Sequence, residues 1–220
     1  MEVKLIDKMG SDLSVVNAAR VSFSKISEWE IIPEAGPTEG ILTFADEKLI
    51  KYLAKHDHWS PFGHASMQFH IKAPVFVARQ LVKHQVGLVW NEVSRRYVDN
   101  EPEFYTPLVW RGSPDNKKQG SSDVAIDIDP NDFIQMMNSA KWMYEHLLEM
   151  GVCPEQARMV LPQSMITEWY WSGTLYAFAR VCNLRCKGDA QLETQMIAKG
   201  IDVLAKEQFP YSWEALRDGD

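Results

Sequence analysis

Residues 67–85 read MQFHIKAPVFVARQLVKHQ, and the periodicity of this stretch changes halfway along it. Over residues 67–72 apolar and polar side chains alternate, which predicts a strand with one buried face. Pro74 then suits the first position of a helix that continues through residues 75–85. A strand that leads directly into an apolar helix indicates an α/β or α+β fold, in which helices cover a sheet.

Strand and helix patterns continue on both sides of this stretch. Residues 3–7 suit a short strand, and helical spacing recurs in residues 11–23 (with Ser11 as N-cap), 46–56, 174–185 and 189–206. No internal repeat or linker interrupts these patterns. We therefore expect one domain over residues 1–220, with a central mixed β-sheet flanked by helices.

The strongest helical pattern follows Asp129, which suits an N-cap, and Pro130, which suits the first helical residue; Gly151 suits the stop. Its predicted buried stripe consists of Phe133, Met136, Met137, Ala140, Met143, Tyr144, Leu147 and Leu148. Two segments without such periodicity, residues 27–41 and 110–129, are candidate lids.

The overall composition limits the classes of function. A net charge of -7 argues against broad nucleic-acid binding, although a local cluster of cations could still bind an anionic small molecule. No window approaches the roughly 18 consecutive apolar residues of a membrane span. The first residues lack a secretory pattern, and three cysteines suit a reducing compartment. We expect a cytoplasmic protein that binds neither nucleic acid nor membrane.

Polar side chains form a stripe on the predicted helix of residues 75–85. Arg79 and Lys83 are four positions apart, as are Gln80 and His84, and Gln80 and Lys83 are three apart, so these side chains share one helix face in an otherwise apolar segment. Taken alone, this pattern slightly favours a core helix with one basic, solvated edge.

A second polar group follows in NEVSRRY, residues 91–97. An extended backbone would place Glu92, Ser94 and Arg96 on one side, where a hydroxyl and a guanidinium group suit a phosphate. Serine-x-arginine triplets are common. This one gains weight because it follows the basic stripe within about ten residues.

Other candidates have simpler explanations. His56, His58 and His64 match no strong zinc template, so we expect no metal site, with a histidine-based site as the minority interpretation. For Arg158 and Arg185, structural ion pairs compete with binding of an anionic substrate.

The three cysteines Cys153, Cys182 and Cys186 have no clearly paired histidine. We therefore interpret them as buried thiols rather than as nucleophiles.

Five ordered segments together resemble the flavin-dependent thymidylate synthases, and the similarity runs from DLSVVNAARVSF to FPYSWEAL. The segments are HDHWSPFGH, FHIKAPVFVARQ, KHQVGLVWNEVSRRY, EQARMVLP and NLRCKGDAQLET. The resemblance implies an α/β fold and conversion of dUMP to dTMP, with methylenetetrahydrofolate as carbon donor, NADPH as reductant and FAD as hydride carrier. It also implies a homotetramer whose active sites form between subunits.

The resemblance also assigns residues by position. Arg185 would face the uracil ring as the catalytic residue, and the dUMP positions are Gln80, Lys83, Glu92, Ser94, Arg96, Arg158 and Arg185. The FAD positions are Ser22, Ser60, Lys83, His84, Gln85, Thr174, Tyr176, Arg180, Leu184 and Asp189.

This chain departs from the family signature, which has an arginine–histidine–arginine triplet and a serine after seven residues. Lys83 and Gln85 replace the two arginines, and eight residues separate Gln85 from Ser94. Gly87 could allow the turn to absorb the extra residue. Two alternatives remain: a homologue that binds flavin or dUMP without catalysis, and a metal-dependent nucleotide phosphohydrolase built on the three histidines.

The expected mechanism needs no enzyme nucleophile, because the sequence offers no obvious activated thiol. Arg185 would stabilise the negative charge that develops on the uracil carbonyl–N3 system as C5 attacks the one-carbon unit. The protein would supply positioning and electrostatics, and the cofactor the redox chemistry.

Overall fold

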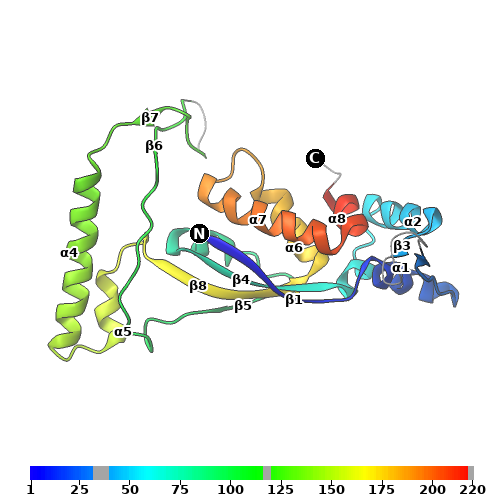
Figure 1. Cartoon of the computed structure of the whole chain (residues 1–220), viewed down its shortest axis with the longest axis horizontal. Coiled ribbons are helices and arrows are strands. Elements are labelled where there is room, and N and C mark those ends of the chain that lie inside the picture. Colours follow the sequence, from blue (N-terminus) through cyan, green and yellow to red (C-terminus); the bar gives the residue numbers. More distant parts are fainter. Residues whose placement is uncertain (32–39, 116–119, 218–220) are drawn as a thin grey trace.

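A computed structural model describes residues 1–31, 40–115 and 120–217. At its centre lies a four-stranded sheet in the order β1 (Glu2–Met9), β4 (Ser66–Pro74), β8 (Ile166–Thr174) and β5 (Leu88–Glu92). Each neighbouring pair in this sheet is antiparallel, where we expected a mixed sheet. The predicted combination of a central sheet with flanking helices is confirmed (Figure 1).

The alternation predicted for residues 67–72 sets the two faces of the sheet. Phe69 and Ile71 of β4 are fully buried and pair in register with Trp171 and Trp169 of β8. Phe178 packs edge-on against Phe69, with ring centroids 5.0 Å apart. The apolar face is therefore the core of the domain, and burial of these large rings stabilises it.

Helices α6 (Leu175–Arg185) and α7 (Leu192–Gln208) cover this apolar face, as Figure 1 shows, and α3 (Val75–Leu81) follows β4 directly. The remaining elements near this body are α1 (Asp12–Arg20), η1 (Val21–Phe23), α2 (Phe44–Lys55), η2 (Ser60–His64) and α8 (Pro210–Arg217).

The helix that was predicted to begin at Pro74 and continue to residue 85 starts one residue later and ends four residues earlier. Pro74 is the N-cap and the last residue of β4, and the helix ends at Leu81. His84 N donates to Leu81 O across 3.0 Å, which closes a tight turn. Gly87 has φ +77°, a left-handed conformation that glycine adopts without strain, and it directs the chain into β5. Pairing of β5 with β8 thus ends the helix early.

Helix α8 was not predicted, because it is only 8 residues long and offers few turns of periodicity. The carboxylate of Asp12 accepts hydrogen bonds from Ser212 N (2.7 Å) and Tyr211 N (3.3 Å). A buried carboxylate near a helix N-terminus satisfies N–H groups that have no intrahelical partner. The first helix therefore stabilises the last one.

Helix α4 (Pro130–Glu149) has the predicted N-cap, since Asp129 accepts from Asn131 N across 2.9 Å. It stands apart from the sheet at one end of the molecule (Figure 1). Of its residues only Met137 and Tyr144 are buried. The prediction of a mostly buried stripe is wrong for this single chain, because α4 packs against the short elements α5 (Pro154–Ala157) and η3 (Arg158–Val160).

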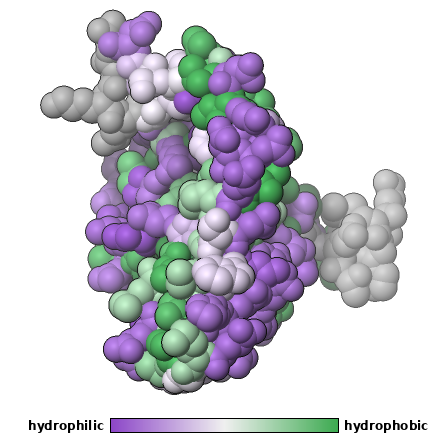
Figure 2. Space-filling model, turned by 90° about the vertical axis from the view of Figure 1, so that its left-hand side faces the viewer, coloured by the Kyte–Doolittle hydropathy of each residue, from purple (hydrophilic) through white to green (hydrophobic). Residues whose placement is uncertain are grey.

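The exposed side chains of α4 include large apolar ones. They are Ile134, Met136, Trp142 and Met143. Figure 2 views the molecule from the α4 side and shows apolar patches lying open between polar ones. Large apolar patches on a soluble protein commonly mark interaction surfaces.

The two candidate lids contain short strands. Strands β2 (Glu30–Ile31) and β3 (Gly40–Ile41) pair, and residues 32–39 lie outside the described residues. Strands β6 (Trp110–Arg111) and β7 (Ala125–Ile126) form a ribbon within the segment that we predicted as loop. None of the described helices is both long and apolar enough to cross a membrane.

Candidate functional site

Three predicted site residues line one polar cavity of about 420 Å³: Gln80 from α3, Arg185 from the end of α6, and Asp189 after it. Arg111 and Gln191 complete much of its wall. Gln80 is held from both ends of its amide, since Nε2 donates to Gln191 Oε1 and Oε1 accepts from Thr194 Oγ1. The structure thus brings together residues from distant parts of the chain around one cavity.

His84 contacts Arg185 at the edge of this group. Arg185 Nε donates to His84 Nε2 across 3.0 Å, so His84 accepts as the neutral imidazole. Burial, followed by the charges of Arg185 and Arg180, lowers the pKa of His84 below its ordinary value of 6.5. Arg185 has no carboxylate partner among the described residues, so our structural ion-pair alternative gains no support for it.

The residues that we predicted to bind a phosphate, Glu92, Ser94 and Arg96, are arranged differently from our expectation. Glu92 ends β5, whereas Ser94 begins a turn in which Tyr97 N donates to Ser94 O across 3.0 Å. The extended segment predicted for residues 91–97 is therefore wrong beyond Glu92. The turn nevertheless keeps serine and arginine together, because Arg96 Nε donates to Ser94 Oγ across 3.3 Å.

Two further contacts position this group. Glu92 accepts from Thr167 Oγ1 across 2.8 Å, which ties β5 to β8. Arg158 is exposed at the start of η3, and its Nε donates only to Glu155 O, at 3.2 Å, within the described part of the chain. None of Ser94, Arg96 and Arg158 lines the cavity of Gln80 and Arg185. In one chain the predicted substrate residues therefore form two separate groups.

The predicted cofactor residues also divide between neighbouring hollows. Ser22 and Ser60 line a cavity of about 830 Å³ beside α1, α2 and η2. Tyr176 and Arg180 line a second cavity of about 620 Å³ between α2, α6 and α8. Asp57 lines both, and Tyr176 donates its hydroxyl to Asp57 Oδ1 across 2.6 Å. The two cavities therefore adjoin at this contact.

The remaining predicted cofactor positions line neither of these two cavities. Thr174 caps α6 by accepting from Ala177 N at 3.2 Å. Lys83 and Gln85 are exposed in the turn after α3, and Leu184 is 52% exposed. These side chains are available to a ligand or a partner chain, but no described contact of this chain unites them.

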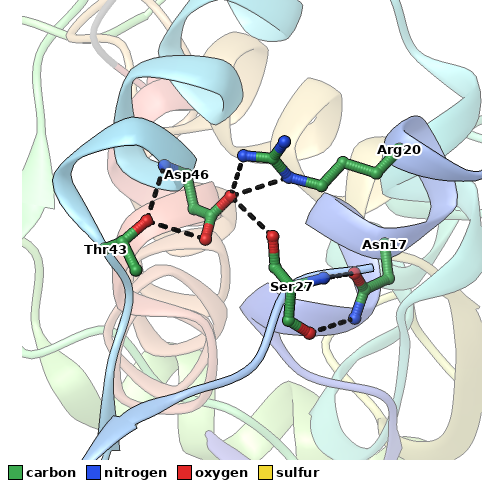
Figure 3. A network of polar contacts seen from close by, with 5 residues as sticks. All are labelled: Asn17, Arg20, Ser27, Thr43 and Asp46. Atoms are coloured by element: carbon green, nitrogen blue, oxygen red, sulfur yellow. Dashed lines mark hydrogen bonds and ion pairs between the residues drawn. The ribbon is translucent and has the colours of Figure 1, made fainter. Parts of the chain in front are cut away.

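Figure 3 shows a polar network that includes Arg20, a residue that lines the larger cavity. The buried carboxylate of Asp46 accepts from Arg20 Nε at 2.9 Å, Ser27 Oγ at 2.9 Å and Thr43 Oγ1 at 2.8 Å. Although burial opposes its ionisation, these hydrogen bonds and the charge of Arg20 lower the pKa of Asp46. Ser27 N also donates to Asn17 Oδ1 across 2.7 Å. The chain that follows Ser22 is thereby fastened to α1 and α2.

The alternative histidine site receives no geometric support. The rings of His56 and His58 lie 6.4 Å apart, and both pack against Tyr52. Among the residues that the structure describes, no group of three or more His, Cys, Asp or Glu side chains is placed to hold a metal ion.

The cysteines follow the prediction only in part. Cys182 is buried, and burial raises the pKa of its thiol. Cys186 is half-buried, and its contact with Cys182 lowers the pKa of its thiol. Cys153 is exposed, because it precedes the short helix α5 at the periphery, so the prediction that it is buried is wrong.

Sequence reasoning missed Arg111, Gln191 and Glu193. Arg111 Nη2 donates to both carboxylate oxygens of Glu193, at 2.8 and 3.0 Å. Arg111 lies in a segment without periodicity, so nothing local identified it as part of a site. Gln191 and Glu193 lie within NLRCKGDAQLET, which we singled out, but only their contacts with Gln80 and Arg111 reveal their place.

Comparison with known proteins adds independent information. A model of the family described as "Thymidylate synthase complementing protein" matches residues 4–211. A "Flavin-dependent thymidylate synthase" from Thermus thermophilus is 38% identical over 218 residues, covering 98% of this chain and 75% of that protein. A protein of the same name from Thermosipho africanus is 39% identical over 223 residues, and the match covers 97% of this chain and 89% of that protein.

A solved structure of a nucleotide-methylating enzyme has a similar fold. The crystal structure of a UMP/dUMP methylase, PolB from Streptomyces cacaoi, bound with 5-Br dUMP, superposes with a TM-score of 0.80. The two sequences are 29% identical, and the match covers 99% of this chain and 94% of that one.

Proposed function

The chain belongs to the flavin-dependent thymidylate synthases, and from that premise we propose that it methylates dUMP at C5 to form dTMP. The observation that carries this proposal is the polar cavity that Arg185 and Gln80 both line, with neutral His84 in contact with Arg185. An uncommitted guanidinium edge next to a neutral imidazole suits a pyrimidine whose carbonyl gains negative charge. The relative and the solved neighbour named above support the same substrate.

Arg185 is the catalytic residue in this proposal. Because its Nε is held by His84, its terminal nitrogens keep a fixed direction and need no reorganisation during the reaction. Donors fixed in advance stabilise charge that develops on the uracil carbonyl–N3 system as C5 attacks the one-carbon unit. A neutral His84 favours this role, because it adds no second positive charge and its Nε2 accepts the hydrogen bond from Arg185 Nε.

Ser94, Arg96 and Arg158, with Glu92, would bind the nucleotide at its phosphate end. They stand apart from the Arg185 cavity within one chain, and the exposed apolar face of α4 offers an assembly surface. Both observations support a homotetramer in which one subunit supplies Gln80 and Arg185 and a neighbour supplies the Ser94–Arg96 turn. Closed symmetric assembly is the usual form of homo-oligomers.

The residues around the two adjoining cavities fit a flavin dinucleotide. Ser22 and Ser60 offer hydroxyl groups, while Arg180 with Lys55 offers cations for phosphate. When bound, FAD would supply the hydride that reduces the transferred carbon to a methyl group. NADPH as reductant and methylenetetrahydrofolate as carbon donor complete the proposed reaction. Lys83 keeps a charge where the family has arginine, but it offers no planar fork.

The proposal extends to the whole chain as a single domain of residues 1–220 acting in the cytoplasm. Its test begins with reconstitution of the purified protein with FAD. We expect a bound flavin spectrum that NADPH bleaches, and dTMP when dUMP and methylenetetrahydrofolate are added. If the flavin binds and is bleached but no dTMP forms, the chain is a non-catalytic homologue. If FAD does not bind at all, the cofactor assignment fails.

A further inference from the structure

Arg111 enters the Arg185 cavity from a segment that we had expected to be a loop. It belongs to the short strand β6, whose pairing with β7 fixes its backbone. Its side chain is anchored twice: Nη2 donates to the Glu193 carboxylate, and Nε donates to Ser121 Oγ across 2.8 Å. The guanidinium plane of Arg111 is therefore fixed on two of its three nitrogens.

The anchor itself is rigid. Glu193 is 4% exposed and lies at the start of α7, next to Thr194, which donates to Gln80. Burial, followed by the negative charge of Glu193, raises the pKa of Tyr105, so its phenol stays protonated beside the carboxylate. A buried carboxylate needs such partners. Arg111, Glu193 and Gln80 thus form one connected wall.

The third nitrogen of Arg111, Nη1, has no hydrogen-bond partner within residues 1–31, 40–115 and 120–217, although Arg111 lines the cavity. Arg185 lines the same cavity and commits only its Nε, to His84. Two guanidinium groups thus present open edges to one polar hollow in a chain whose net charge is -7. The carboxylate of Asp189 also lines the hollow and Glu193 pairs with Arg111, so the hollow carries no excess of positive charge; its open guanidinium N–H donors nevertheless suit an anionic ligand.

We propose that Arg111 binds the nucleotide through its phosphate, which makes it a substrate-binding residue of the Arg185 cavity. This inference rests on the proposed function and deepens it. The uracil ring is neutral and has Arg185 as its donor, whereas the phosphate is fully charged and accepts several charge-assisted hydrogen bonds. A guanidinium group fixed by Glu193 and Ser121 loses little side-chain entropy when it binds such a group.

The test is calorimetric titration of the FAD-reconstituted protein with dUMP and, separately, with deoxyuridine. Arg111→Gln should weaken dUMP binding roughly tenfold or more, the usual loss for a hydrogen bond to a charged group. Deoxyuridine, which lacks the phosphate, should bind both proteins with similar affinity. Arg111→Lys should be intermediate, because lysine keeps the charge without the fork. The control is Lys206→Gln, which removes one positive charge, as Arg111→Gln does, but from an exposed position on α7. This variant should bind dUMP normally.

Loss of Arg111 leaves Glu193 buried without its counterion, so the single variant could lose stability. The double variant Arg111→Gln/Glu193→Gln removes both charges and keeps two amides that can pair. It should fold and still bind dUMP weakly. Normal dUMP binding by the double variant, or equal losses for dUMP and deoxyuridine, would overturn the phosphate contact. Failure of the unaltered protein to bind dUMP would instead refute the proposed function.

Discussion

Arg185 and His84 lie 101 positions apart in the chain and meet through a hydrogen bond of 3.0 Å. The contact joins the end of α6 to the turn after α3, at the edge of the polar cavity. It requires a neutral histidine, because a protonated imidazole has no acceptor and would repel the guanidinium group. Much of the proposed chemistry depends on this pair.

Replacement of Arg185 tests the catalytic role. Arg185→Ala should lower kcat for dTMP formation at least a hundredfold, the usual cost of losing a donor to developing charge. Its flavin spectrum should be unchanged, and Arg185→Lys should recover part of the rate. Near-normal turnover of Arg185→Ala would remove Arg185 from the mechanism.

Neutrality of His84 predicts a dependence of stability on pH. Its pKa is lowered in the folded protein, so as pH falls through about 6.5 the unfolded chain takes up the proton first. The free energy of unfolding should therefore decrease as pH falls below 7. In His84→Gln this contribution should vanish. Urea titrations of both proteins between pH 8 and about 5.5 check it, since the other histidines are common to both. Identical pH profiles would contradict the lowered pKa.

Assembly of the site between subunits predicts complementation. Arg185→Ala and Arg96→Ala chains should each be nearly inactive alone. When the two chains are co-expressed and associate at random, about a quarter of the sites combine an intact Arg185 from one subunit with an intact Arg96 from its neighbour. About a quarter of normal activity should therefore return. Activity no higher than that of the separate variants would place both groups in one chain.

The Asp46 network predicts a local loss of stability. Asp46→Asn should lower the free energy of unfolding by about 2–3 kcal/mol, somewhat less than for a fully buried pair because the Arg20 side chain is 24% exposed. The lowered pKa of Asp46 adds stability at neutral pH that disappears as pH falls below its ordinary value of 3.8. Glu47→Gln, which removes an exposed charge paired with Lys51, should cost under about 0.5 kcal/mol. Equal costs in chemical denaturation would contradict the network's role.

The sequence predicted those parts of the fold that depend on local periodicity. The alternation in β4 and the capped start of α4 are confirmed because they depend on nearby residues. The early end of α3 could not be predicted, since it follows from pairing of β5 with β8. The exposure of α4 was missed for a related reason. An apolar stripe indicates that a helix face is buried, but it does not show whether the same chain or a partner chain covers that face.

The candidate site shows the same division. Motifs identified Gln80 and Arg185, and the structure places both on one cavity. Arg111 was missed because its role depends on Glu193, 82 positions away, and on a two-residue strand without a local pattern. Ser94 does not line the cavity of Arg185 within one chain. Local spacing could not show this separation, although the family resemblance implied active sites that form between subunits.

Transfer of an isotopic label from the folate to dUMP distinguishes flavin-dependent methylation from every alternative named above. The purified protein would be stripped of flavin, then supplied with dUMP, NADPH and methylenetetrahydrofolate labelled in its one-carbon unit, with and without FAD. Label is expected in the 5-methyl group of dTMP only when FAD is present. Labelled dTMP formed equally well without FAD, or none in FAD-saturated protein that binds dUMP, would contradict flavin-dependent methylation.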